Sequence, residues 1–188
     1  MSALLRLDKV ACVRGGRLLF EGLDLALEAG GAALVTGPNG IGKSSLIRLA
    51  AGLLRPAAGI VEREAAPALA DDGVALDSRL TLGRALAFWA GLDNTDPAPA
   101  MAAMGLEALA GVPVAMLSTG QRKRATLARA IASRAALWLL DEPANGLDPD
   151  GEARLAAAMA AHRANGGAIL AASHLPLALA GAQAVRLG

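Results

Sequence analysis

The segment Gly37-Pro38-Asn39-Gly40-Ile41-Gly42-Lys43-Ser44 decides the fold of this 188-residue chain. It satisfies the pattern G-x-x-x-x-G-K-[ST] and lies between an apolar run of strand length, residues 32–36, and a stretch predicted to be helical, residues 44–52. Its glycines let successive backbone N–H groups face one anion, and the positive end of the helix dipole adds to the attraction. The sequence therefore predicts a phosphate-binding loop.

This loop predicts ATP and Mg²⁺ as cofactors. Lys43 is expected to reach the β- and γ-phosphates, and the Ser44 hydroxyl is expected to ligate Mg²⁺. The complete set of expected ATP-binding residues is Gly37, Pro38, Asn39, Gly40, Ile41, Gly42, Lys43, Ser44 and Ser45.

A second apolar run, residues 136–140, leads directly into Asp141 and Glu142. Ligands of open α/β sheets bind at the carboxyl ends of the strands, so both carboxylates are expected at the phosphate edge. Asp141 would orient Mg²⁺, directly or through water, while Glu142 would polarise an attacking water. The alternative is an ordinary strand that ends in an acidic turn.

The order of the other elements predicts an α/β fold with a mostly parallel sheet that is covered on both faces. Thr81 is the expected N-cap of the first of the helices that occupy residues 80–110. The remaining strands are predicted at 4–10, 23–27, 60–61, 68–70 and 168–172, the remaining helices at 121–133 and 149–164, and a last helix and strand after residue 172.

Composition narrows the class of protein. The length suits a single domain, residues 1–188, and the net charge of +1 with no tyrosine argues against a nucleic-acid surface. The single cysteine, Cys12, excludes an internal disulfide and is expected to be a buried strand thiol.

Residues 1–13 alternate like a strand and not like a signal peptide, so the protein is expected to stay in the cytoplasm. Residues 164–185 have no charged side chain, but polar and glycine residues interrupt them, which favours a strand, a loop and a short helix over a membrane span.

The segment Leu117-Ser118-Thr119-Gly120-Gln121 resembles the LSGGQ signature loop of the ABC ATPases, with Thr119 in place of the commoner glycine. The resemblance implies a P-loop NTPase of the ABC ATPase type, with an antiparallel β-subdomain and a short helical subdomain at about 76–133. It also implies a head-to-tail homodimer in which Ser118, Thr119, Gly120 and Gln121 act on the ATP that the partner's P-loop holds.

Two more segments match the ABC ATPases in order. Asn145-Gly146-Leu147-Asp148 resembles the loop that crosses the dimer interface, with Asp148 at its end, and Ser173-His174 resembles the switch histidine after a strand. The resemblance implies that His174 contacts the γ-phosphate and holds the attacking water together with Glu142, so that these two are the expected catalytic residues. His162 is expected to be solvated on a polar helix face.

The chain departs from the family pattern at two positions. Arg14 stands where an aromatic ring usually stacks on adenine, and a guanidinium can also stack on a base. Residues 68–73, ALADDG, lack the usual glutamine, and Asp71 or Asp72 would either contact metal-bound water or cap a loop. The basic residues of the helix after the signature loop are expected to form a solvated face without a catalytic role, the alternative being a nucleic-acid patch: Arg122, Lys123, Arg124, Arg129 and Arg134.

Four stretches are similar to the ATP-binding subunits of the cytochrome c maturation, or haem exporter, family: residues 80–89, LSTGQRKR, residues 137–143 and residues 166–177. This similarity implies an ATPase, peripheral at the cytoplasmic face of the bacterial inner membrane, that energises haem delivery for c-type cytochromes. The implied partners are a second copy, a transmembrane permease and haem-handling membrane proteins, with no nucleic acid. The alternatives are the ATPase of another ABC exporter or importer, a nucleotide-dependent dimerisation switch with weak hydrolysis, and a soluble ABC protein that acts on ribosomes or DNA.

Overall fold

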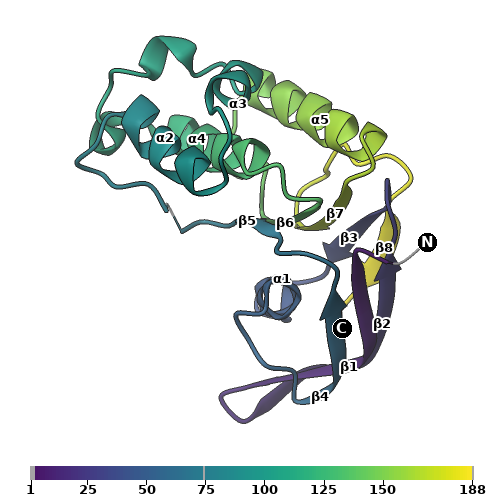
Figure 1. Cartoon of the computed structure of the whole chain (residues 1–188). Helices are drawn as coiled ribbons and strands as arrows, with labels where there is room; N and C mark the ends of the chain where they lie inside the picture. Colours follow the sequence, from purple (N-terminus) through teal and green to yellow (C-terminus); the bar gives the residue numbers. More distant parts are fainter. Residues whose placement is uncertain (1–2, 74, 188) are drawn as a thin grey trace.

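A five-stranded parallel sheet forms the centre of the protein, whose computed structural model describes residues 3–73 and 75–187 (Figure 1). Every pairing in this sheet is parallel, and the strand order differs from the chain order, so the chain crosses over between neighbouring strands. From one edge to the other the strands are β5 (Ala68–Ala70), β6 (Leu137–Asp141), β7 (Ala168–Ala172), β3 (Ala32–Thr36) and β8 (Gln183–Arg186).

Both faces of this sheet are buried, and each faces its own hydrophobic core. In β6 the side chains of Leu137 and Leu139 join one core, while those of Trp138 and Leu140 join the other. This alternation follows from the two-residue period of a strand. It explains why the central strands read as continuous apolar runs, as parallel sheets covered on both faces do.

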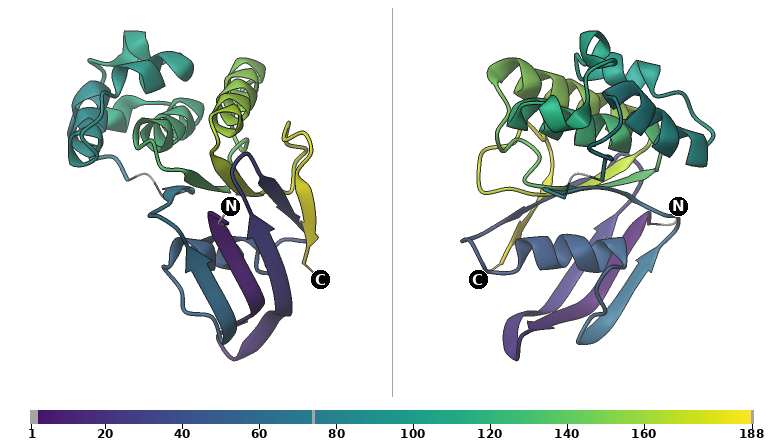
Figure 2. Two further views of the ribbon diagram at one scale, coloured as in Figure 1. Left: turned by 45° about the vertical axis from the view of Figure 1, so that its right-hand side comes forward. Right: turned by 90° about the vertical axis from the view of Figure 1, so that its left-hand side faces the viewer.

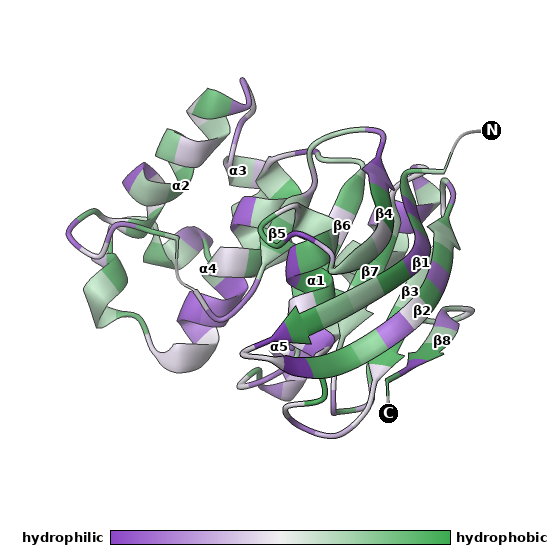
Figure 3. Cartoon of the chain, turned by 90° about the horizontal axis from the view of Figure 1, so that it is seen from below, coloured by the Kyte–Doolittle hydropathy of each residue, from purple (hydrophilic) through white to green (hydrophobic). Residues whose placement is uncertain are grey.

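One face is covered by α1 (Lys43–Ala51), which lies between the parallel sheet and a second, antiparallel sheet (Figures 1 and 2). Figure 3 views the molecule from the side of the antiparallel sheet, whose long curved strands cross over α1. Cys12 lies in this sheet and is buried, as predicted. In spatial order the strands are β2 (Arg17–Leu27), β1 (Leu5–Arg14) and β4 (Ala58–Arg63).

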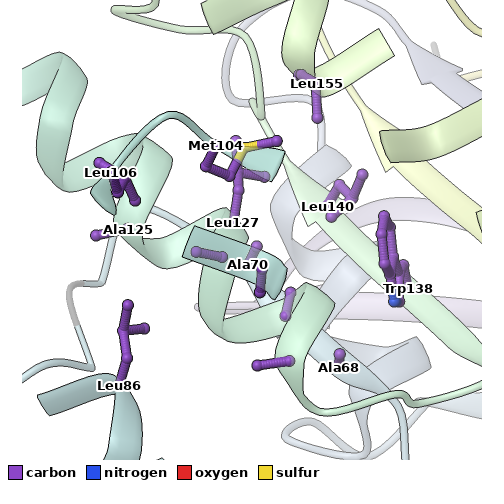
Figure 4. Close-up of a cluster of buried hydrophobic side chains, with 14 of the residues drawn as sticks. Ala68, Ala70, Leu86, Met104, Leu106, Ala125, Leu127, Trp138, Leu140 and Leu155 are labelled. Carbon is purple, nitrogen blue, oxygen red and sulfur yellow. The ribbon is translucent and has the colours of Figure 1, made fainter. Parts of the chain in front are cut away.

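The opposite face is covered by helices. Figure 4 shows their core, where Met104 and Leu127 lie close together between Leu140 and Trp138 of the sheet on one side and Leu86 on the other. The covering elements are α2 (Leu82–Leu92), α3 (Ala98–Ala103), α4 (Thr119–Ala132) and α5 (Pro149–Ala164), with the 3₁₀ turns η1 (Glu107–Leu109) and η2 (Val114–Met116). The predicted α/β class, with a parallel core sheet, an antiparallel β-subdomain and a helical subdomain, is confirmed.

The helix predicted after β7 is wrong. Residues 174–182 contain no helix, because Ser173 turns the chain locally: its Oγ accepts from the backbone N–H of Leu175 at 3.1 Å, and Pro176 follows. Leu177 and Leu179 then pack on the helical core without helical backbone. Within residues 3–73 and 75–187, no helix has both the length and the apolar character needed to cross a bilayer.

The prediction of a solvated His162 is wrong, and that of a solvated basic face is wrong in part, since Arg134 is exposed. The His162 ring is half-buried and stacks on Trp138, with ring centroids 3.9 Å apart and planes 10° apart. On α4 the side chain of Lys123 is 7% exposed, and the half-buried guanidinium of Arg129 lies 5.0 Å from the Trp89 ring centroid. α4 packs against β5, α2, α3 and α5, so little of its circumference is left for water.

Candidate functional site

The candidate site lies at the carboxyl edge of the parallel sheet, where four strands end side by side. β3 leads into the glycine-rich loop, β5 into Asp71 and Asp72, β6 into Glu142, and β7 into Ser173 and His174. Parallel pairing places all these ends at one edge, so the topology alone gathers residues that are far apart in the sequence.

The glycine-rich loop has a backbone that other residues would strain. Gly37 has φ 145° and Gly42, the N-cap of α1, has φ 119°. A Cβ on Gly37 would lie 2.6 Å from the carbonyl oxygen of Leu187. The Lys43 ammonium is held at the loop backbone, where it donates to the carbonyl oxygens of Gly37 at 2.9 Å and Pro38 at 3.2 Å.

A cleft of about 450 Å³, here called the phosphate cleft, opens beside this loop. Arg14, at the end of β1, shares the cleft with the loop, so the chain does bring this arginine to the nucleotide side of the fold. The residues that line the phosphate cleft are Arg14, Leu19, Asn39, Gly40, Gly42, Lys43, Ser44, Ser45 and Glu142. A larger hollow of about 890 Å³ lies on the antiparallel sheet and contains none of the predicted site residues.

Asp141 and Ser44 together have the character of a divalent-cation site. The Asp141 side chain is buried, and burial raises its pKa above the ordinary value, while a hydrogen bond from Ser44 opposes that shift. Its Oδ1 atom is buried without a hydrogen-bond partner. A buried carboxylate oxygen without a donor is unfavourable, and Mg²⁺ prefers such hard oxygen ligands. The residues present therefore fit Mg²⁺.

Glu142 and His174 are in direct contact. The Oε2 atom of Glu142 accepts from the backbone N–H of His174 at 3.2 Å and lies 2.7 Å from the imidazole Nδ1 atom. The contact arises because Asp141 pairs with Ala172 in the parallel register of β6 and β7, which places Glu142 beside the Ser173–His174 segment. Glu142 has φ 48°, which is unusual for a residue with a side chain.

The signature residues lie at the start of α4. Ser118 and Gln121 form a capping box: Ser118 Oγ accepts from the Gln121 N–H at 3.2 Å, and Gln121 Oε1 accepts from the Ser118 N–H at 2.9 Å. Because the Ser118 hydroxyl acts only as an acceptor in this pair, its own hydrogen is available to donate. A Cβ on Gly120 would lie 2.9 Å from the carbonyl oxygen of Gly146.

A second cleft of about 300 Å³, here called the signature cleft, lies beside these residues. It shares no lining residue with the phosphate cleft. Asp148 is the N-cap of α5, where its carboxylate accepts from the Gly151 N–H at 2.8 Å. The lining residues of the signature cleft are Asp71, Asp72, Thr119, Arg122, Lys123, Thr126, Asn145 and Gly146.

The two aspartates after β5 have different roles. Asp71 accepts from the Gly73 N–H at 3.0 Å, which is a local loop cap. Asp72 instead forms an ion pair with Lys123, with Nζ 3.1 Å from Oδ1. Sequence reasoning missed Lys123, because its partner is 51 residues away and no local pattern links the two.

Comparison with known proteins identifies the family to which the chain belongs. The ABC transporter family matches residues 20–145. The Cytochrome c biogenesis ATP-binding export protein CcmA of Sphingopyxis alaskensis is 63% identical over 95% of this chain and 94% of its own length. The protein of the same name from Zymomonas mobilis is 53% identical over 95% of this chain and 82% of its own length.

Solved structures agree on the fold. An ATP-binding subunit of an ABC transporter aligns with a TM-score of 0.82 at 23% identity, over 92% of this chain and 80% of that one. The cbiO1 protein of Clostridium perfringens, part of the ABC transporter complex cbiONQ, aligns with a TM-score of 0.75 at 23% identity, over 93% of this chain and 80% of that one. The chain therefore belongs to the ABC transporter family and, within it, to the cytochrome c biogenesis ATP-binding export proteins.

Proposed function

We propose that this chain hydrolyses ATP to energise a membrane ABC complex that delivers or exports haem for the biogenesis of c-type cytochromes. The observation that carries the reaction is the Glu142–His174 pair at the carboxyl edge of the sheet, whose Glu142 lines the phosphate cleft. The identity of 63% with a cytochrome c biogenesis relative supports the physiological role.

The glycine-rich loop binds the phosphates of ATP. Its backbone N–H groups and the N-terminus of α1 attract the anion, and Lys43 exchanges its two loop carbonyls for phosphate oxygens. Arg14 contacts the base in place of an aromatic ring, since it lines the same cleft.

Ser44 and Asp141 hold the Mg²⁺ that accompanies ATP. When bound, Mg²⁺ supplies a positive charge that neutralises the phosphate oxygens. The structure describes no group of three or more His, Cys, Asp or Glu suited to a metal ion. Ser44 and Asp141 would supply two oxygen ligands to the cation, and phosphate oxygens and water would supply the others, as is common for Mg²⁺.

Glu142 acts as the general base. A water oxygen attacks the γ-phosphorus, the bond to the bridging oxygen of the β-phosphate breaks, ADP leaves, and the carboxylate takes the water proton. His174 fixes the carboxylate through Oε2, which leaves Oε1 to accept that proton. His174 also contacts the γ-phosphate and thereby connects it to the base.

Two copies of the chain form the working unit. The phosphate and signature clefts share no lining residue, so one chain offers two separate half-sites. In a head-to-tail dimer, Ser118, Thr119, Gly120 and Gln121 of one chain cover the ATP that the other chain holds, and the loop that ends at Asp148 crosses the interface. ATP is then part of the interface.

The dimer works at the cytoplasmic face of the bacterial inner membrane, as a peripheral component bound to a transmembrane permease and to haem-handling membrane proteins. The test is to purify the tagged Glu142→Gln protein from detergent-solubilised membranes with ATP and to identify what accompanies it. Recovery of a polytopic subunit together with haem-binding proteins is expected. Recovery of an unrelated permease would contradict the haem assignment and leave the ATPase assignment intact.

A dimerisation switch with weak hydrolysis is the second candidate. It is favoured by one observation: Asp72, at the position that lacks the usual glutamine, is engaged by Lys123. Purified complex that binds ATP and dimerises without measurable phosphate release would support the switch over the motor.

A further inference from the structure

Lys123 is a buried cation in a position that the proposed reaction does not use. It lies in the second turn of α4 with 7% of its side chain exposed. Burying an ammonium group is unfavourable unless its charge and its hydrogen bonds are matched. Here the charge faces a carboxylate and two of the three donors are used, because Nζ donates to Asp72 Oδ1 at 3.1 Å and to the main-chain oxygen of Asp141 at 3.3 Å.

The second of these contacts acts on the peptide unit that joins Asp141 to Glu142. The carbonyl of that unit accepts from Lys123, and its N–H donates to the carbonyl oxygen of Ala172 at 2.8 Å. A peptide unit is planar and rigid, so contacts at both of its polar ends fix its orientation.

The orientation of this unit matters because Glu142 is strained. Its φ of 48° is unfavourable for a residue with a Cβ, and such conformations persist where the surroundings hold them. The angle φ is the rotation about the N–Cα bond of Glu142, which joins this peptide unit to the Cα atom that carries the side chain. The fixed unit, together with this φ, thus sets the direction in which the Glu142 side chain leaves the backbone, and the carboxylate at its end lies 2.7 Å from His174 Nδ1.

We propose that Lys123 is a positioning residue that holds the Asp141–Glu142 peptide unit and thereby keeps the Glu142 carboxylate against His174. Lys123 lies on α4, the helix that begins at the signature residues. A shift of α4 therefore moves the Lys123 ammonium, which holds the peptide unit of Glu142. Its link to Asp72 ties the segment after β5 to the same point. The structural claim, that Lys123 holds this peptide unit, does not depend on the reaction. Only the expected effect on kcat rests on the proposed ATPase function.

The structural test uses histidine signals, since the chain has two histidines and one is in the pair. Lys123→Met keeps an apolar stem and removes the donors. Lys123→Arg keeps charge and donors, and the adjacent signature cleft gives its larger head room. Lys123→Gln keeps an uncharged donor, and Arg122→Met is the control that removes a neighbouring charge. Thermal unfolding verifies the fold of each full-length variant.

In ¹⁵N-histidine spectra at fixed pH, Lys123→Met is expected to lose the hydrogen-bonded Nδ1 signal of His174 while the His162 signals stay unchanged. Arg and Gln at position 123 are expected to retain it. An unchanged His174 signal in Lys123→Met, or the same loss in Arg122→Met, would overturn the proposal. Should Lys123→Met unfold, a His174 signal lost in both the Arg and the Gln variants would overturn it equally.

The kinetic test uses the complete membrane complex. Lys123→Met is expected to lower kcat about ten- to a hundred-fold, the range for a misplaced catalytic group, with KM for ATP changed less than about three-fold. Lys123→Arg should restore most of kcat. A wild-type complex without turnover would refute the ATPase function and leave the histidine result standing, whereas normal turnover in Lys123→Met would refute the positioning role alone.

Discussion

The Nδ1 atom of His174 lies 2.7 Å from Oε2 of Glu142, although 32 residues separate the two in the chain. The same oxygen also accepts the backbone N–H of His174, so the histidine holds one carboxylate oxygen twice. The pairing depends on strand order, because β6 and β7 are neighbours and end in register. It therefore belongs to the fold and not to side-chain flexibility, which gives the mutations below well-defined expectations.

Glu142→Gln keeps the size of the side chain and its contact with His174, but an amide cannot accept the proton of water. Turnover is expected to fall about 10²- to 10⁴-fold, the usual contribution of a general base. ATP should then accumulate in a dimer, which size-exclusion chromatography with light scattering measures. Glu152→Gln, at an exposed position of α5, is the matched control. Equal turnover in both variants would contradict the assignment.

Lys43→Met removes the ammonium that lies at the P-loop backbone. The Kd for ATP should increase about ten- to a hundred-fold, since a hydrogen bond to a charged phosphate contributes about 1.5–3 kcal/mol. Isothermal titration calorimetry measures it, with Arg48→Met, exposed on the same helix, as the control. A Kd that rises equally in the control would show a general charge effect instead.

Asp141→Asn should change stability in opposite directions with and without Mg²⁺-ATP. The carboxylate is buried, and its Oδ1 atom has no partner, so removing the charge should raise the melting temperature in EDTA. With Mg²⁺-ATP the melting temperature of the wild type should rise more than that of the variant, because the variant has lost a metal ligand. Differential scanning fluorimetry measures both. Equal gains in the two proteins would remove Asp141 from the metal site.

His162 should make stability depend on pH. Burial lowers its pKa below the ordinary value, with backbone hydrogen bonds opposing the shift. The unfolded chain then binds more protons than the folded one as the pH falls below about 6.5, so stability declines on acidification by at most about 1.4 kcal/mol per pH unit. Urea unfolding from pH 7.5 to 5.5 measures the slope, and His162→Gln should flatten it. An unchanged slope in that variant would assign the effect elsewhere.

Ser118→Ala should weaken ATP-induced dimerisation more than ATP binding to one chain, because Ser118 precedes Thr119, which lines the signature cleft, and does not line the phosphate cleft. It also removes half of the capping box, at a cost of about 1 kcal/mol. Ser133→Ala, at the other end of α4, is the control for the helix itself. Analytical ultracentrifugation with ATP compares the two. Loss of dimerisation in both would point to the helix and not to the serine.

The fold was largely predictable, because its signals are local. Short apolar runs placed β3, β5 and β7 at their observed bounds, the predicted bounds of α5 also match, and the glycine-rich loop fixed the order of strand and helix. The site residues whose role depends on one motif were equally accessible, since each motif carries its own geometry.

Two of the errors, at Lys123 and at His162, share one physical cause, which is burial imposed by distant segments. Nothing near Lys123 in the sequence announces Asp72, and nothing near His162 announces the ring of Trp138 on which it stacks. The missing helix after β7 has a different, local cause, because the hydrogen bond from the N–H of Leu175 to Ser173 Oγ outweighs the helical pattern of the apolar residues that follow.

The indole of Trp89 gives the protein an intrinsic optical probe. The chain has two tryptophans and no tyrosine, so its near-ultraviolet emission comes from two indoles alone. Trp89 joins α2 to the segment after β5 by donating to the carbonyl oxygen of Ala75 at 2.7 Å, with the Arg129 cation over its ring. Replacing Trp138 with phenylalanine leaves one emitter at that junction. Movement of the helices relative to the sheet during turnover can then be followed as a shift in the wavelength of Trp89 fluorescence emission, without any attached dye.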